Sequence, residues 1–246
     1  MPPPVRRLLP VSLLILLTVA FSIAAAEKGR QELIGEVLGQ PVSRDAIRTG
    51  EDVRLADELG RLFLVPVLAE FRKEHKQEVT PTASEIDFAT AYFDEQHRER
   101  IRDEAPKLRE QLRKVQQQLA EPGLTDKRRD ELKTEEVVLQ TQLKPPGRTF
   151  AVFVLKNWKF QRFLYDNFGG GRLLWQQAGT EAFDAMHQWL LAQEKAGKFK
   201  VTDPALRAEM LKYWTTQERS PFLVTDQEQI RRQFLEPQWV QAPPGE

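Results

Sequence analysis

The amino-acid sequence predicts a mainly α-helical protein, with a helical lobe formed by N- and C-terminal helices and a projecting antiparallel helical hairpin. Three observations predict this fold class. Apolar residues recur at helical spacing over much of the chain. Two Thr-x-x-Glu sequences, at 82–85 and 225–228, have the spacing of a helix capping box. A heptad-like apolar pattern extends over 101–143 and is interrupted by a Pro-Gly pair.

The first 26 residues have the three parts of a secretory signal peptide. Arg6 and Arg7 precede an apolar run over 8–23, and Ala24 to Ala26 form a small-residue cleavage site. The sequence therefore predicts export, to the periplasm, with a soluble protein left after cleavage. A retained membrane anchor is the alternative, because 8–26 approaches the roughly 20 residues that span a bilayer. Pro10 and the Ala triplet favour cleavage.

Composition excludes several classes of function. Arg6 and Arg7 are the only charges among the first 26 residues, so cleavage would leave 34 basic and 36 acidic residues. This near-neutral balance gives no reason to expect a nucleic-acid partner. The chain has no cysteine, which excludes disulfides, thiolate catalysis and thiolate metal sites. An exported protein without disulfides needs a well-packed core.

The region 27–93 is expected to begin with a short extended segment, over 32–42, with a turn at Gly39-Gln40. Ser43 is then expected to cap a helix. The stretch 52–74 has broadly helical apolar spacing, with a kink or break predicted at Pro66. A further helix should start at Thr82, because its hydroxyl and the Glu85 carboxylate can each accept a hydrogen bond from the other residue's amide.

The region 94–147 is predicted to form the hairpin. A proline at 106 indicates a kink or a new helix start, and Glu121-Pro122-Gly123 separates the two arms. Thr125 can cap the second arm, which ends before Pro145. The apolar stripe is narrow, so each arm needs a partner and the returning arm is the nearest. The predicted seam residues of the first arm are Ile101, Leu108, Leu112, Val115 and Leu119, with Ala105 in the same 4-3 spacing; Leu132, Glu136, Leu139 and Leu143 continue it.

The region 148–240 contains 16 of the 22 aromatic residues and is predicted to be helical, followed by a tail over 241–246. An apolar helix over 150–168 should end at three glycines, 169–171. A short strand or connector is expected over 172–177. Three more helices are predicted, over 181–196 capped by Thr180, from Asp203-Pro204 to about 217, and over 226–235 capped by Thr225.

No catalytic, cofactor or metal site is predicted, so the sequence indicates a protein that is not an enzyme. The three histidines, His75, His97 and His187, lie far apart and form no zinc signature. The glycines before Arg172 could in principle cradle an anion. They follow a helix instead of preceding one, which favours a helix C-cap and turn. Neither a Gly-x-Ser-x-Gly nor a Ser-x-x-Lys motif occurs.

The aromatic residues after residue 150 suggest a binding surface. Part of this set could line an apolar groove for extended polypeptide, and the alternative is ordinary core packing. The wider aromatic stripe contains Trp158, Phe160, Phe163, Trp175, Phe183, Trp189, Tyr213, Trp214, Phe222 and Trp239. The peptide-binding residues predicted from it are Trp158, Phe163, Trp175, Trp189 and Trp214.

The stretch 34–93 resembles the N-terminal chaperone domain of SurA-like, parvulin-associated periplasmic foldases. One matching motif is Val-Leu-Gly-Gln-Pro-Val-Ser at 37–43, similar to a small turn of the Asn-Gly-x-x-Ile-[Ser/Thr] kind before the first helix. The other is Val-Thr-Pro-Thr-Ala-Ser-Glu-Ile at 79–86, similar to the helix start [Ile/Val]-x-Pro-[Ser/Thr]-x-x-Glu-[Ile/Val]. The resemblance implies a helical lobe that binds unfolded polypeptide clients.

The chain departs from this family where the parvulin isomerase domain would be inserted. The predicted hairpin of about 50 residues stands there, and the strands and paired histidines of a parvulin site are missing. The sequence therefore predicts a non-catalytic, chaperone-like protein whose partners are unfolded or cell-envelope polypeptides. One alternative is an envelope assembly or scaffold subunit that docks a partner through the hairpin seam. Another is an enzyme related to peptidyl-prolyl isomerases, which no group of residues supports.

Overall fold

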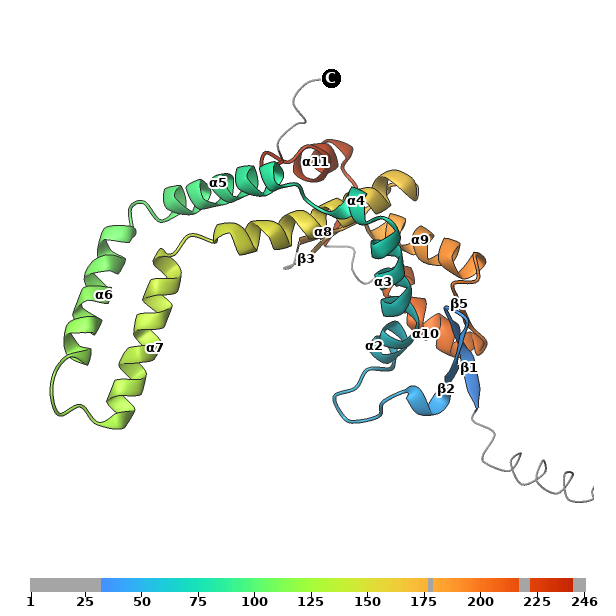
Figure 1. Cartoon of the computed structure of the whole chain (residues 1–246), viewed down its shortest axis with the longest axis horizontal. Coiled ribbons are helices and arrows are strands. Elements are labelled where there is room, and N and C mark those ends of the chain that lie inside the picture. The colour runs from blue at the N-terminus through green and yellow to red at the C-terminus, as the bar shows by residue number, and fades with distance from the viewer. Residues whose placement is uncertain (1–31, 177–178, 217–221, 241–246) are drawn as a thin grey trace, which may run out of the picture. The chain divides into compact units, whose positions relative to one another are not determined.

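The computed structural model describes residues 32–176, 179–216 and 222–240. In this part the protein is mainly helical and has two small three-stranded sheets, which confirms the mainly α-helical class that the sequence predicts (Figure 1). The predicted signal peptide and the tail over 241–246 lie outside the described residues. Within the described ranges, every helix is too short or too polar to cross a bilayer.

The chain forms two compact units, each assembled from stretches that are distant in sequence. Among the described residues, unit 1 contains those up to Val67 together with Ala196–Lys212, and unit 2 contains those between Leu68 and Lys195 and those from Tyr213 to Val240. Helices α3 (Val65–Glu74) and α10 (Pro204–Thr215) each continue from one unit into the other.

The sheet of unit 1 has the strand order β2-β1-β5, and both strand pairs are antiparallel. A turn with positive φ at Leu38 (49°) and Gly39 (76°) joins the first two strands, which confirms the predicted extended segment and places its turn one residue earlier. The third strand was not predicted from the sequence. The strands are β1 (Leu33–Val37), β2 (Gln40–Ser43) and β5 (Phe199–Val201).

Gly35 is at the closest approach in this sheet. A Cβ atom at this position would lie 2.1 Å from the Lys200 carbonyl oxygen and 2.8 Å from the Phe63 ring. Only glycine therefore allows β5 and the Phe63 side chain to pack against β1 together. Phe63, Ile34 and Phe199 are almost completely buried.

The helix predicted to begin at Ser43 is only the 3-10 turn η2 (Arg44–Ala46), without a side-chain cap. Ser43 ends strand β2, where it is paired with Leu33. The predicted break at Pro66 is also absent from the described backbone, since α2 (Leu55–Leu59), the π-helical turn η3 (Gly60–Leu64) and α3 follow without interruption. The wider π turn lies immediately before the proline, which lacks an N–H group.

Glu58 is a buried carboxylate in unit 1. Its oxygens accept hydrogen bonds from Arg48 Nε (2.9 Å) and from Arg61 Nη2 (2.8 Å), while its side chain is only 3% exposed. These bonds, first from Arg48 and then from Arg61, hold the pKa of Glu58 well below its ordinary value. The ion pair between Glu58 and Arg48 links α2 to the loop that follows β2, and the two arginines compensate the cost of burying the carboxylate.

Unit 2 contains two antiparallel helix pairs, which meet at an angle in Figure 1. The first pair is α5 with α8, and the second is α6 with α7. The Thr82–Glu85 capping box at the start of α5 is present as predicted. The bounds of these helices are α5 (Ala83–Arg100), α6 (Ala105–Leu119), α7 (Asp126–Leu143) and α8 (Gly147–Asn167); α4 (Lys76–Val79) and α9 (Phe183–Lys195) complete this part of the unit.

Helices α6 and α7 form the predicted hairpin. Pro106 is in the first turn of α6, and the Thr125 hydroxyl accepts a hydrogen bond from the Arg128 amide as a cap of α7. Ile101 is different from the other predicted seam residues, because it is the C-cap of α5 and lies outside the hairpin. The core of the seam is Val115, Leu132 and Leu139, against which Leu108, Leu112, Leu119 and Leu124 pack.

The α5–α8 pair packs around small residues and is covered by the C-terminal segment. Ala89 and Ala151 are completely buried between the helices. The Trp239 ring contacts those of Phe93 and Trp158, at 5.7 and 5.5 Å between centroids. The Trp158 indole N–H donates to the Phe234 carbonyl at 2.7 Å. The end of the chain therefore completes the core of this pair.

The sheet of unit 2 has the strand order β4-β3-β6. The prediction that Thr180 caps a helix is wrong, because Thr180 is in β4 and pairs with Trp175. The cap predicted at Thr225 is instead Asp226, whose carboxylate accepts a hydrogen bond from the Gln229 amide. The elements are β3 (Leu173–Gln176), β4 (Gly179–Glu181) and β6 (Leu223–Val224), followed by α11 (Gln227–Ile230) and the π turn η5 (Arg231–Leu235).

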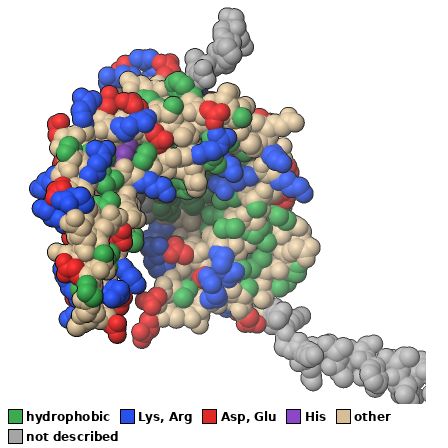
Figure 2. Space-filling model, turned by 60° about the vertical axis from the view of Figure 1, so that its left-hand side comes forward, with side chains coloured by type: hydrophobic (Ala, Val, Ile, Leu, Met, Phe, Trp, Pro, Cys, Tyr) green, Lys and Arg blue, Asp and Glu red, His purple; other side chains and the backbone are tan. Residues whose placement is uncertain are grey.

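The surface carries both signs of charge. On the face shown in Figure 2, Lys and Arg side chains are interspersed with Asp and Glu side chains, and hydrophobic side chains lie among them. This mixture agrees with the near-zero formal net charge of the chain. The face shown is therefore not specialised for a polyanion.

Candidate functional site

The five aromatic residues predicted to bind peptide lie in different environments within unit 2. Trp189 is completely buried and packs against Phe71 at 5.2 Å. Phe163 is half-buried against Phe71 and His75. The prediction that Trp189 lines a binding groove is therefore wrong. Trp189 is a core residue, on the face of α9 that is covered by other helices.

Trp158 and Trp214 are half-buried and have fixed hydrogen bonds. The Trp158 indole N–H donates to a backbone carbonyl of η5, as described above. The Trp214 indole N–H donates to Glu181 Oε1 at 3.0 Å, and the Tyr213 hydroxyl donates to Glu181 Oε2 at 2.7 Å. These indoles therefore hold together elements of unit 2, which limits their freedom to turn toward a ligand.

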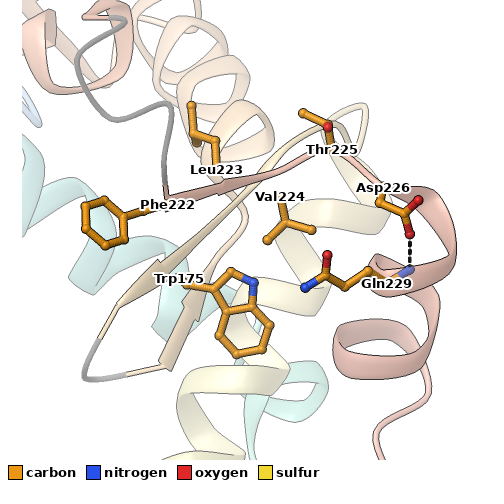
Figure 3. A pocket seen from close by; sticks show the side chains of 7 residues that line it. All are labelled: Trp175, Phe222, Leu223, Val224, Thr225, Asp226 and Gln229. Atoms are coloured by element: carbon orange, nitrogen blue, oxygen red, sulfur yellow. Dashed lines mark hydrogen bonds between the residues drawn. The ribbon is translucent and has the colours of Figure 1, made fainter.

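Trp175 is the one of the five that leaves a large surface exposed, at 40%. It is on the central strand β3 and borders an open pocket of about 380 Å³. The pocket is lined by Trp175, Phe222, Leu223, Val224, Thr225, Asp226 and Gln229. Figure 3 shows the Trp175, Val224 and Gln229 side chains turned toward one another, with the Phe222 ring at the other end of β6.

The strand register explains why these residues gather. Leu174 of β3 pairs with Leu223 of β6, in an antiparallel arrangement. Phe222 comes directly before β6 in the chain and lines the same pocket as Trp175. Phe222 is 62% exposed, so the two aromatic side chains present a large apolar area to solvent.

The polar side chains of the pocket are Thr225, Asp226 and Gln229, and some of their groups already have partners. Asp226 Oδ1 accepts from the Gln229 backbone amide at 2.7 Å, which uses the carboxylate as the cap of α11. The Gln229 side-chain amide is 3.2 Å from Gln233 Oε1. The pocket therefore combines aromatic and aliphatic side chains with a hydroxyl, a carboxylate and an amide, a composition suited to a peptide segment that carries both apolar side chains and peptide bonds.

The glycine-rich turn before β3 serves the fold. Arg172 is ion-paired with Asp184, with 2.8 Å between Arg172 Nη2 and Asp184 Oδ1. Burial alone would raise the pKa of Asp184, but its hydrogen bonds with Arg172 lower that pKa below its usual range. A Cβ atom at Gly171 would lie 2.7 Å from Asp184. The guanidinium is thus committed to a carboxylate of the same unit.

We find no candidate metal-binding site in the part of the chain that the structure describes. There, no group of three or more His, Asp or Glu side chains is placed to hold an ion.

The sequence identified Trp175 but did not single out Phe222, which is in the aromatic stripe only. Its position directly after a proline gave no signal of exposure. The pairing of β6 with β3 brings the segment that begins with Phe222 to the pocket that Trp175 borders. A search for similar proteins found no match among protein-family models, curated proteins or solved structures.

Proposed function

We propose that this protein is a non-catalytic, exported chaperone-like protein that binds apolar segments of unfolded polypeptides. The observation that carries the proposal is that two exposed aromatic residues, Trp175 and Phe222, line one open pocket. Burying apolar area there would contribute about 25 cal/mol per Å². Export follows from the predicted signal peptide and belongs to the proposal.

The pocket suits transient capture better than specific recognition. It offers two large exposed rings, which can contact many different apolar side chains, so binding does not depend on one sequence. The pocket is open, which allows a segment of a long chain to enter without threading its end. Reversible binding of many different clients would follow.

The first experiment measures how the chain without its first 26 residues affects aggregation of an unfolded outer-membrane-type protein. We expect reduced light scattering and a fluorescent client peptide that binds in the micromolar range. Phe222→Ser should raise the Kd by about fivefold, because it removes one exposed ring from the pocket. Leu33→Ser is the matched control, since Leu33 is 58% exposed on a strand of unit 1.

Two results would contradict the proposal. One is a protein that neither suppresses aggregation nor binds the peptide. The other is an equal loss of binding in Phe222→Ser and Leu33→Ser, because it would show that any exposed apolar side chain acts in the same way. A solution-mass measurement in parallel tests the scaffold alternative, which requires a stable complex.

The scaffold alternative, in the form that uses the seam for docking, has little support. Val115, Leu132 and Leu139 are buried between α6 and α7, so the seam is occupied by the hairpin itself. An alanine at Val115 would loosen the hairpin before it weakened any docking.

A further inference from the structure

One face of α7 is uncharged although the helix as a whole is rich in charge. Val137 and Val138 are 61% and 49% exposed. Thr134 and Thr141 lie one turn before and one turn after them, and both are exposed. The buried seam residues Leu132 and Leu139 are on the opposite side, so this face points away from α6.

The two threonines add methyl groups to this face. The Thr134 hydroxyl donates to the Asp130 carbonyl at 2.9 Å, and the Thr141 hydroxyl donates to the Val137 carbonyl at 2.7 Å. Each hydroxyl proton is therefore used within the helix, which leaves the methyl groups toward solvent. The result is an apolar stripe two turns long, or about 10 Å.

The same kind of surface continues on the first turns of α8. Phe153 is 55% exposed, and it lies about 200° around the helix from Ala151 and from Leu155, which are buried toward α5. Phe150 leaves 43% of its surface exposed and packs against Phe93 at 5.2 Å. Phe153 therefore points away from α5, as Val137 and Val138 point away from α6.

The exposed side chains of α7 and of α8 face the same region of unit 2. Figure 1 shows that α7 and α8 form the inner side of the bend between the two helix pairs, while α6 and α5 form the outer side. Residues that point away from α6 and α5 consequently face the inside of the bend. We define this inner surface by Val137, Val138 and Phe153, together with the exposed part of Phe150, which borders it and whose ring also contacts Phe93 of α5.

The size of the inner surface favours a short polypeptide segment over a second copy of this chain as its partner. The four side chains expose on the order of 400 Å² in total, taking about 200 Å² for a complete aromatic side chain. A stable interface buries about 800 Å² on each partner. The inner surface is thus too small to hold a second copy of this chain as a stable dimer, and large enough for a few apolar side chains.

The chemistry of the inner surface also limits which partners it can bind. The face has no charged side chain among these four residues, and helical backbone offers no free edge to which a strand could add. Recognition must come from apolar contact with uncharged segments. We propose that the inner surface is a second binding surface for short, uncharged apolar stretches of unfolded polypeptide, which rests on the proposed function and assigns to the hairpin a part in it.

The test uses an end-capped fluorescent peptide, Leu-Ser-Phe-Gln repeated three times, and measures its Kd by anisotropy. Val137→Lys and Phe153→Lys should each raise the Kd by about tenfold, because each removes apolar contact and forces a charge to be desolvated. Gln117→Lys is the matched control, since Gln117 is exposed on α6 at the side away from the seam. Circular dichroism checks that each variant stays folded, and Val138→Lys replaces any variant that does not.

The outcomes separate this inference from the function on which it rests. Unchanged Kd values in Val137→Lys and Phe153→Lys, with weaker binding by Phe222→Ser, would overturn the inner surface and leave the proposed function intact. An unmodified protein that does not bind the peptide would overturn both. A dimer that Val137→Lys converts to a monomer would identify a second copy as the occupant, and so would overturn the choice of partner.

Discussion

The α6–α7 hairpin and the α5–α8 pair are both antiparallel helix pairs of unit 2, but they are stabilised in different ways. The hairpin has a repeating seam of aliphatic residues that the two arms supply to each other. The α5–α8 pair has alanines at its centre and depends on aromatic rings from the C-terminal segment. A local pattern is sufficient for the first pair, whereas the second needs residues from a distant part of the chain.

The two helix pairs should differ most in how far the effect of a buried Leu→Ala substitution spreads through unit 2. Leu132→Ala and Leu155→Ala both remove a completely buried leucine, at a cost of about 2–5 kcal/mol. We expect Leu132→Ala to open the hairpin alone, and Leu155→Ala to destabilise α5, α8 and the C-terminal segment together. Hydrogen exchange read by mass spectrometry locates the faster-exchanging amides. Faster exchange over the whole of unit 2 in Leu132→Ala would show that the two pairs are not independent.

A smaller loss of stability is expected when the indole ring of Trp239, on which the α5–α8 pair depends, is removed. Trp239→Ala deletes the contacts with Phe93 and Trp158, and should cost about 2 kcal/mol because the ring is half-buried. Exchange should rise in α5 and α8 and stay unchanged in α6 and α7. Trp239→Phe keeps an aromatic ring and serves as the control, with a smaller expected loss. Equal losses in both variants would argue against a packing role.

The smallest effect is on the pH dependence of stability. Burial alone would raise the pKa of Glu85, but hydrogen bonds with Lys159 and Thr82 lower it below its ordinary value of 4.5. A carboxylate whose pKa is lower in the folded state stabilises the fold at higher pH. Its contribution is complete above about pH 4.5 and is lost as the pH falls from there toward the folded-state value.

Glu85→Gln should remove this part of the pH dependence while it keeps an oxygen that can accept the Thr82 amide proton. The measurement is the free energy of urea unfolding between pH 3 and 7, with exchange in α5 as the local readout. Glu110→Gln in the hairpin is the comparison, because the Glu110–Arg113 pair is exposed and contributes little. A steeper pH profile in Glu85→Gln would contradict the assignment.

Much of the candidate site was beyond the reach of sequence patterns. Trp175 was selected as an aromatic residue among many, and the same criterion selected the completely buried Trp189. Aromatic residues occur in cores and in binding sites alike, so residue type alone does not separate them. Exposure is a property of the neighbouring elements, here of the short strand β6 and its register with β3.

The sequence by itself determined the features that depend on nearby residues. It determined the hairpin, because the heptad spacing, the Pro-Gly break and the Thr125 cap act within about 40 residues. It also determined the start of α5 and the end of α8, where one side chain or one glycine fixes the backbone.

Only the tertiary structure decided which distant segments pair. Three residues, Phe199–Val201, form strand β5 because β1 lies beside them, although they are some 160 residues apart in sequence. Thr180 forms a strand instead of a helix cap for the same reason, since β3 supplies hydrogen-bond partners that a local pattern cannot anticipate. Short polar and aromatic stretches have weak local preferences, so the energy of packing and strand pairing decides their structure and the exposure of Trp175 and Phe222.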